Sequence, residues 1–279
     1  MNEDSFSGKL VIVTGGSKGI GKATAKRIGE LGGSVCVVAR GKKALAEAAE
    51  EIKSAQAGHD QFVETIAADC ANMDQLSPRL NEFIDRYGVP DYLINCAGYA
   101  YPQYIEKLTL DDFKKNMDIN YYAQLVPILI LLPHLMERKS GYMVNISSLA
   151  GLFGLMGYAC YSPTKFAIVG LTDTLRHELR PYNIHCSVVC PSDVRTPGYE
   201  VENQTKPQEC LFLSEGVPIM EPEEAAKEIV DGILKNEFLI IPGDGGKLAW
   251  AAYSADPEGF RTELDAGLVE ARRRLGKNG

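Results

Sequence analysis

The sequence predicts an α/β fold, a doubly wound seven-stranded parallel sheet with helices on both faces, and two observations predict it. Short apolar runs alternate with longer segments of helical periodicity along most of the 279 residues. Several of the short runs are apolar throughout, as expected of strands that are buried on both faces of a parallel sheet. Strand–helix alternation with right-handed crossovers then indicates a Rossmann-type architecture.

Each element can be located by its pattern. We expect strands at 9–14, 34–39, 62–67, 91–95, 142–147, 185–190 and 238–241. We expect helices near 20–31, 42–55, 73–87, 111–138, 160–180 and 222–236. The last helix opens with Pro222, Glu223 and Glu224, and a helix N-terminus favours both proline and acidic side chains. No repeat, low-complexity run or linker interrupts the pattern, so residues 1–279 are expected to form a single domain.

Two stretches depart from the alternation. Residues 192–218 follow the sixth strand and combine three prolines and many polar residues with little periodicity. An irregular segment of this length at the carboxyl edge of a sheet is typical of a substrate lid, although a plain surface excursion is the alternative. Residues 243–279 form a C-terminal extension whose amphipathic stretch, 260–275, could pack on the body, on another subunit or on a membrane surface.

Composition excludes several functional classes. With 29 basic and 37 acidic residues the net charge is −8, which disfavours an extended nucleic-acid interface. The seven cysteines are an odd number and several lie in apolar runs, so we expect reduced core residues rather than disulfides. Cys186 and Cys190 lie in one extended segment without a second ligand pair nearby, and no metal site is expected.

The location expected from the sequence is cytoplasmic. The first eight residues are polar and do not resemble a signal peptide. The longest apolar stretch, 123–136, is shorter than the roughly 20 residues that a membrane span needs. We therefore expect no membrane span, while peripheral contact with a membrane stays open.

A glycine-rich turn follows the first strand. Gly15, Gly19 and Gly21 would supply a tight turn, close approach of the backbone to a diphosphate and close helix–strand packing. About 20 residues further on, an acidic side chain would hold the ribose 2′-hydroxyl of NAD, but this sequence has Arg40 there and Lys18 in the turn itself. Both cations can pair with a 2′-phosphate, so the predicted cofactor is NADPH/NADP+.

Tyr161 and Lys165 form the candidate catalytic pair. They are four residues apart at a helix start and therefore share one helix face. An adjacent ammonium should lower the pKa of the phenol from its ordinary value of about 10 and make it an effective proton donor. Ser148 lies at the end of the fifth predicted strand, and Asn120 lies inside a long helical pattern where a buried structural amide is the alternative reading.

Together these motifs resemble the classical short-chain dehydrogenase/reductases over roughly residues 8–242. The resemblance rests on the glycine-rich turn, 95–98, Asn120, Ser148, Tyr161 with Lys165, and 191–196. It implies Tyr161 as acid/base, Lys165 on the nicotinamide ribose, Ser148 on the substrate oxygen and Asn120 in a proton relay. The implied cofactor-binding residues are Gly15, Ser17, Lys18, Gly19, Ile20, Gly21, Arg40, Asp69, Cys70, Asn95, Ala97, Gly98, Tyr161, Lys165, Pro191, Val194 and Thr196. Association as a homodimer or homotetramer through the helices near 111–138 and 160–180 is also implied.

A narrower resemblance, to the 3-ketodihydrosphingosine reductases, rests on 161–168, 179–184 and above all 193–207. It implies reduction of a long-chain, lipid-like ketone by NADPH, and such a substrate needs an apolar channel beside Tyr161. Candidate lining residues are Leu152, Phe153, Leu155, Met156, Tyr158, Tyr199, Leu211, Phe212 and Leu213. The alternatives are a 3-oxoacyl or other long-chain carbonyl reductase and, from a different class, a non-catalytic NADP-binding sensor.

Overall fold

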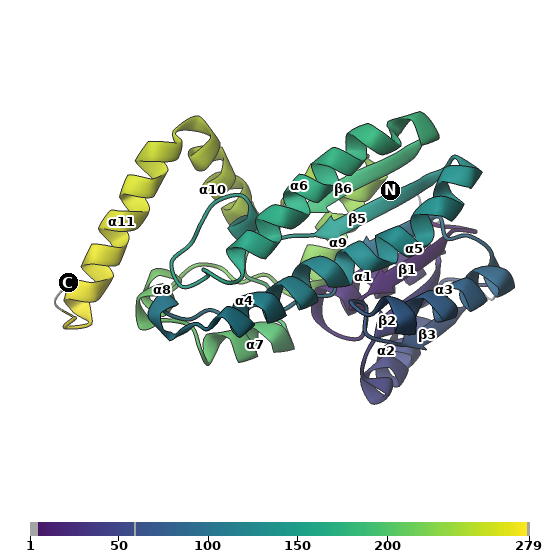
Figure 1. Cartoon of the computed structure of the whole chain (residues 1–279), viewed down its shortest axis with the longest axis horizontal. Coiled ribbons are helices and arrows are strands. Elements are labelled where there is room, and N and C mark those ends of the chain that lie inside the picture. The colour runs from purple at the N-terminus through teal and green to yellow at the C-terminus, as the bar shows by residue number, and fades with distance from the viewer. Residues whose placement is uncertain (1–4, 59, 278–279) are drawn as a thin grey trace.

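A computed structural model describes residues 5–58 and 60–277, and a seven-stranded parallel sheet forms its centre (Figure 1). The strands are β1 (Leu10–Thr14), β2 (Ser34–Ala39), β3 (Val63–Ala67), β4 (Tyr92–Asn95), β5 (Gly141–Ile146), β6 (Ile184–Val189) and β7 (Leu239–Ile240). Their spatial order is β3-β2-β1-β4-β5-β6-β7, so the direction of winding reverses between β1 and β4. Ligands of open parallel sheets bind outside the carboxyl ends of the strands at this reversal. The predicted fold class is confirmed.

Helices cover both faces of the sheet because each strand sends alternate side chains to opposite sides. In β1, Ile12 joins a cluster with α3 (Met73–Tyr87), α5 (Ala123–Arg138) and α6 (Ser162–Leu179). Its neighbours Val11 and Val13 join the opposite cluster. That cluster is completed by α1 (Gly19–Glu30), α2 (Lys42–Ala55) and α9 (Pro222–Leu234). The two clusters bury β1 completely and most of β4, β5 and β6, and they fix the carboxyl ends of β1, β4 and β5 along one edge.

The helix predicted at 111–138 is three consecutive segments, α4 (Leu110–Met117), a π-helical turn η2 (Asp118–Tyr122) and α5. Together they form a continuous helical stretch of 29 residues, which is long and apolar enough to cross a membrane. Half of its most apolar 18-residue segment is buried within the fold. Such burial is also the pattern of a core helix. The expectation that no segment spans a membrane therefore stays a prediction.

The expected irregular segment at 192–218 contains two short helices, α7 (Pro197–Asn203) and α8 (Gln208–Leu213). Val194 near its start forms a β-bridge with Met220 just after its end. The segment therefore returns to the sheet edge that it leaves. We call residues 192–218 the lid segment. The remaining connections include single helical turns at η1 (Ile105–Lys107), η3 (Leu149–Gly151) and η4 (Arg180–Tyr182).

The C-terminal extension forms a hairpin of two helices, α10 (Asp244–Ala255) and α11 (Pro257–Arg274), which projects from the end of the sheet (Figure 1, yellow). The amphipathic stretch predicted at 260–275 corresponds to α11, whereas α10 was not expected. Phe153, Tyr253 and Phe260 pack their rings together where the hairpin joins the body. Of the placements left open for this stretch, the structure shows packing on the body.

Candidate active site

The glycine-rich turn between β1 and α1 has backbone geometry that side chains would prevent. Gly15 and Gly19 have φ values of 66° and 53°, which L-residues with a Cβ rarely adopt. A Cβ at Gly15 would lie 2.7 Å from the backbone nitrogen of Ala97, and one at Gly19 would lie 2.9 Å from a methyl of Thr196. No side chain caps the N-terminus of α1, and its first turn holds no acidic residue, so its amides remain available to an anion.

A single cavity of about 1120 Å³ runs from this turn along the carboxyl edge of the sheet. It brings together nearly all residues that the sequence singled out. Those in its wall are Gly15, Ser17, Lys18, Gly19, Ile20, Gly21, Arg40, Asp69, Cys70, Ala97, Gly98, Ser148, Tyr161, Lys165, Pro191, Val194 and Thr196. Such an elongated cavity with a glycine-lined, amide-rich end has the form that a dinucleotide needs.

Asn95 is an exception that corrects one expectation, because its side chain does not line the cavity. It is fully buried, accepts a hydrogen bond from the Thr14 hydroxyl at 3.3 Å and donates to the Asn145 side chain at 3.0 Å. Asn145 in turn donates to the Thr172 hydroxyl at 3.0 Å. A buried amide must find such partners, and Asn95 therefore links β1, β4 and β5 instead of presenting its side chain to a ribose.

Tyr161 and Lys165 lie together at the start of α6, as their spacing predicts. Tyr161 is the residue before the helix, and the Lys165 ammonium nitrogen lies 5.5 Å from the centre of its ring. Lys165 is 4% exposed and donates a hydrogen bond to the carbonyl oxygen of Ile146 at 3.0 Å. The Ser147 hydroxyl donates to the Lys165 carbonyl at 2.8 Å. The end of β5 therefore holds the position of the lysine.

Burial dominates the electrostatics of this pair. Desolvation and the nearby Glu202 carboxylate raise the pKa of Tyr161, and hydrogen bonding by Ser148 only partly offsets them. Desolvation also lowers the pKa of Lys165 to about 8. The expected net lowering of the tyrosine pKa is therefore wrong, because burial has the larger effect. The phenol keeps its proton at neutral pH, which suits a proton donor.

Ser148 follows β5 directly and caps the turn η3. Its oxygen accepts a hydrogen bond from the Ala150 amide at 3.2 Å. That contact occupies a lone pair and leaves the hydroxyl proton to donate. Because Ser148 and Tyr161 lie in the wall of one cavity, both hydroxyls can serve a single carbonyl oxygen.

Asn120 lies in the π-helical turn η2, fully buried behind the cavity wall. Its side chain accepts from the Tyr99 amide at 2.8 Å and donates to the Tyr99 carbonyl at 3.0 Å. A Cβ on Gly98 would lie 2.8 Å from the side-chain oxygen of Asn120 and 3.3 Å from the Lys165 nitrogen. The Asn120 side chain thus has the hydrogen-bond partners expected of a buried structural amide, and its part in a proton relay stays a prediction.

Of the apolar channel residues that the sequence suggested, Phe153, Leu155, Met156, Tyr158, Tyr199 and Leu213 line the cavity, whereas Leu152, Leu211 and Phe212 do not. The C-terminal hairpin adds Ala249, Phe260, Leu264 and Leu268 to its wall. Sequence reasoning missed Ala249 because α10 was not expected. It missed the other three because the amphipathic pattern of α11 does not say which surface its apolar face contacts.

The lid segment also contributes three charged side chains to the cavity wall, Asp193, Glu202 and Lys206. Sequence reasoning assigned them no role. Glu202 lies in α7 and Lys206 lies just after it, and oppositely charged residues four apart usually pair on a solvated face. Here the side chains of these two residues are only 13% and 2% exposed.

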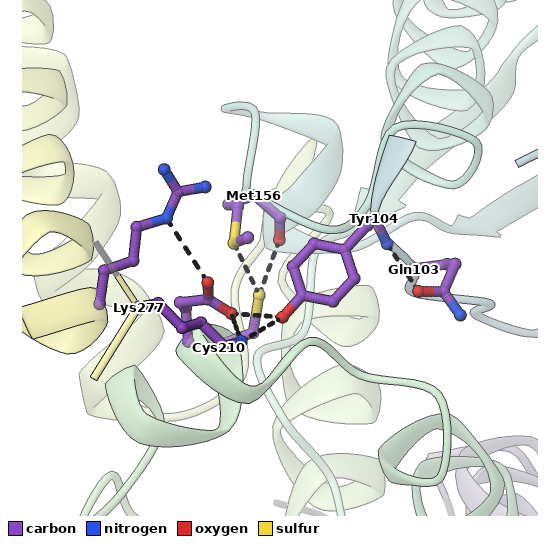
Figure 2. Close-up of polar contacts among 7 residues, drawn as sticks. Gln103, Tyr104, Met156, Cys210 and Lys277 are labelled. Atoms are coloured by element: carbon purple, nitrogen blue, oxygen red, sulfur yellow. Dashed lines mark hydrogen bonds and ion pairs between the residues drawn. The ribbon is translucent and has the colours of Figure 1, made fainter. Parts of the chain in front are cut away.

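The C-terminal hairpin is fastened to the lid segment through Glu209, a residue of α8 that is 1% exposed. Figure 2 labels two of its partners, Tyr104 and Lys277. The Tyr104 hydroxyl donates to Glu209 at 2.6 Å, and the Lys277 ammonium lies 3.1 Å and the Arg272 guanidinium 3.5 Å from its carboxylate. The far end of the cavity is therefore enclosed by segments that are widely separated in sequence.

Among residues 5–58 and 60–277 no group of three or more histidine, cysteine or carboxylate side chains has the arrangement of a metal site. The seven cysteines are free, and five of them are buried. The cavity places the Tyr161 phenol, which can transfer a proton, and the Ser148 hydroxyl, which can donate a hydrogen bond, in one wall with the glycine-rich turn.

Comparison with known proteins agrees with this geometry. The family model described as short chain dehydrogenase matches residues 9–207. A 3-dehydrosphinganine reductase of Danio rerio is 36% identical over 242 residues, which cover 86% of this chain and 73% of that protein. A 3-ketodihydrosphingosine reductase of Mus musculus is 37% identical over 271 residues, covering 95% and 82%. The crystal structure of levodione reductase superposes with a TM-score of 0.79 at 26% identity, covering 89% of this chain and 100% of the solved chain. The chain belongs to the short chain dehydrogenase family and is an oxidoreductase.

Proposed function

We propose that this protein uses NADPH to reduce a long-chain ketone, 3-ketodihydrosphingosine, to the secondary alcohol dihydrosphingosine. The observation that carries the proposal is the continuity of one cavity, from the dinucleotide cradle past Ser148 and Tyr161 to an apolar end formed by Leu264 and Leu268. An apolar end of this kind suits an alkyl chain. The two relatives compared above, which are named for this ketone, support the choice of substrate.

The chain's own residues explain the proton half of the reaction. A nicotinamide dinucleotide supplies the hydride when it is bound. Ser148 donates a hydrogen bond that holds the ketone oxygen, and Tyr161 donates its proton to that oxygen as negative charge develops there. The raised pKa of Tyr161 keeps the phenol protonated until negative charge develops on the ketone oxygen. Lys165, held by the Ile146 carbonyl, places a positive charge beside the phenol.

The preference for NADPH over NADH rests on the cavity end near β2. Lys18 and Arg40 line it, both are exposed, and neither forms an ion pair with another described residue. The adjoining N-terminus of α2 has no side-chain cap and begins with Lys42 and Lys43 rather than an acid. A 2′-phosphate would meet two cations and free amides there.

Replacing Arg40 tests this preference. Arg40→Ala should raise the dissociation constant of NADPH at least about tenfold, because a charge-assisted hydrogen bond contributes about 1.5–3 kcal/mol. The dissociation constant of NADH should change little. Arg79→Ala removes an exposed arginine of α3 outside the cavity and serves as the control. Equal NADPH affinity in wild type and Arg40→Ala would refute the assignment.

The test of the proposed function is NADPH oxidation with three ketones: 3-ketodihydrosphingosine, a 3-oxoacyl thioester and a steroid ketone. The sphingoid ketone should give the highest kcat/KM. Tyr161→Phe should lower its kcat by about 10²–10⁴-fold while NADPH still binds, since the variant lacks only the donated proton. Preference for the thioester would favour the 3-oxoacyl alternative. Cofactor binding without turnover of any ketone would favour the sensor.

We further propose that the protein associates with itself through α5 and α6. Leu129 and Phe166 are large apolar side chains with 48% and 45% of their surface exposed, and Tyr122 just before α5 is 44% exposed. Large apolar side chains that stay exposed on a single chain can be buried in a subunit interface. Light scattering should give at least twice the mass of one chain, and Phe166→Glu should shift the protein toward the monomer.

A further inference from the structure

Three charged side chains beside Tyr161 have no part in the proton and hydride transfer described above. Asp193 lies at the start of the lid segment, and Glu202 and Lys206 lie on α7 and just after it. All three line the cavity that holds Tyr161 and Ser148. Charges are costly to remove from water, so their presence in a partly apolar wall calls for a partner.

Glu202 is close to the reacting groups. Its Oε1 atom accepts a hydrogen bond from the Tyr158 hydroxyl at 2.5 Å and lies 3.3 Å from the Lys206 ammonium. The ring centres of Tyr158 and Tyr161 are 5.9 Å apart. The Tyr158 side chain therefore lies between this carboxylate and the catalytic phenol. Both Glu202 and Asp193 raise the pKa of Tyr161, which places their charge within its electrostatic reach.

The three side chains do not balance in charge. Lys206 neutralises Glu202, whereas no described residue forms an ion pair or a side-chain hydrogen bond with the Asp193 carboxylate. In the described part of the chain, no hydrogen bond or ion pair ends on Oε2 of Glu202 either. These three side chains therefore carry one net negative charge between them. Three carboxylate oxygens, both of Asp193 and Oε2 of Glu202, are available to a donor.

We propose that Asp193, assisted by Glu202, binds a substrate ammonium group next to the ketone and so makes the site selective for α-amino ketones. This inference rests on the proposed function, since 3-ketodihydrosphingosine carries its amino group on the carbon adjacent to the carbonyl. A ketone oxygen held by Ser148 and Tyr161 brings that nitrogen to the surrounding cavity wall. A carboxylate there can form a charge-assisted hydrogen bond with it.

The test compares two substrates of equal chain length, 3-ketodihydrosphingosine and the 1-hydroxy-3-ketone that lacks its amino group. Asp193→Asn should lower kcat/KM for the amino ketone at least about tenfold, mainly through KM, and change it less than about twofold for the amine-free ketone. Glu202→Gln should act in the same direction. Glu200→Gln, an equal charge change at an exposed position of α7, should leave both substrates unaffected.

Asp193→Glu retains the charge and should recover part of the lost selectivity, and the NADPH dissociation constant of each variant shows that it is folded. An equal loss on both ketones would overturn the inference and leave the proposed function standing. Selectivity in Asp193→Asn equal to that of wild type would overturn it as well. A wild-type protein that reduces only the amine-free ketone would overturn the proposed function and this inference together.

Discussion

At the scale of single residues, desolvation decides how the catalytic pair behaves. The Lys165 ammonium is buried in the core, where it donates a hydrogen bond to one carbonyl oxygen. Desolvation lowers its pKa to about 8. Tyr161 beside it becomes a weaker acid than a free tyrosine. The simple argument that a neighbouring ammonium lowers a phenol pKa omits the burial of both groups, and burial has the larger effect here.

The lowered pKa of Lys165 predicts a pH dependence. A base with a pKa of about 8 is charged below that pH and neutral above it. The kcat/KM for NADPH reports the groups of the cofactor-free enzyme and should therefore fall as the pH rises through about 8. The profile would be measured at saturating ketone. A flat profile up to pH 10, near the ordinary lysine value, would show that Lys165 keeps its charge.

At the scale of elements, the site depends on a local departure from a regular helix. The π-helical turn η2 interrupts a continuous helical segment at Asn120, and π turns are frequent at functional sites. There the Asn120 side chain forms hydrogen bonds with the backbone of Tyr99 and lies close to Gly98. The periodicity of 111–138 predicts a helix correctly but carries no sign of the extra residue in this turn.

Gly98 offers a test of this element. In Gly98→Ala the new methyl group would meet Asn120 at 2.8 Å and Lys165 at 3.3 Å, so at least one of them must move. We expect kcat to fall at least about tenfold, because small displacements of catalytic groups are costly. The control is Gly154→Ala, whose methyl group meets nothing within 4 Å. Unchanged kcat in Gly98→Ala would show that neither position matters to the rate.

At the scale of the whole molecule, the sequence predicts the sheet and most of the motif residues that meet in one cavity, but only part of the apolar end of that cavity. The glycines with Arg40, and Tyr161 with Lys165, could be placed in the cavity because each group is recognised by a short spacing in the chain. Asn95, Glu202 and the hairpin residues could not. Their surroundings come from segments far away in the chain, so burial and partners appear only once the tertiary structure is formed.

The Glu209 contacts give a whole-molecule prediction. Desolvation acts to raise its pKa, but the Tyr104 hydroxyl, the residue's own backbone amide and Lys277 together lower it to about 2. A carboxyl with a lowered pKa stabilises the fold fully above its ordinary value of 4.5 and loses this effect as the pH falls toward 2. Glu209→Gln should lower the free energy of unfolding by about 1–3 kcal/mol at pH 7.

The measurement is urea unfolding followed by the fluorescence of the single tryptophan, Trp250 in α10. The stability difference between wild type and Glu209→Gln should shrink as the pH falls from about 4.5 toward 2. Glu215→Gln, at an exposed position after α8, is the matched control. A difference that stays constant with pH would show that the Glu209 charge does not fasten the hairpin.

The division of the cavity wall between the two parts of the chain has a consequence for how such proteins diversify. Residues 15–98 provide most of the cradle end, which Thr196 also touches at Gly19, whereas residues 153–158 and 199–268 provide the apolar end. Changes in the later part can therefore accumulate without disturbing the earlier part. Exchanging residues 199–277 for the equivalent part of another family member, with Val194 and Thr196 kept, offers a route to a chimaera with a new ketone range and unchanged coenzyme choice.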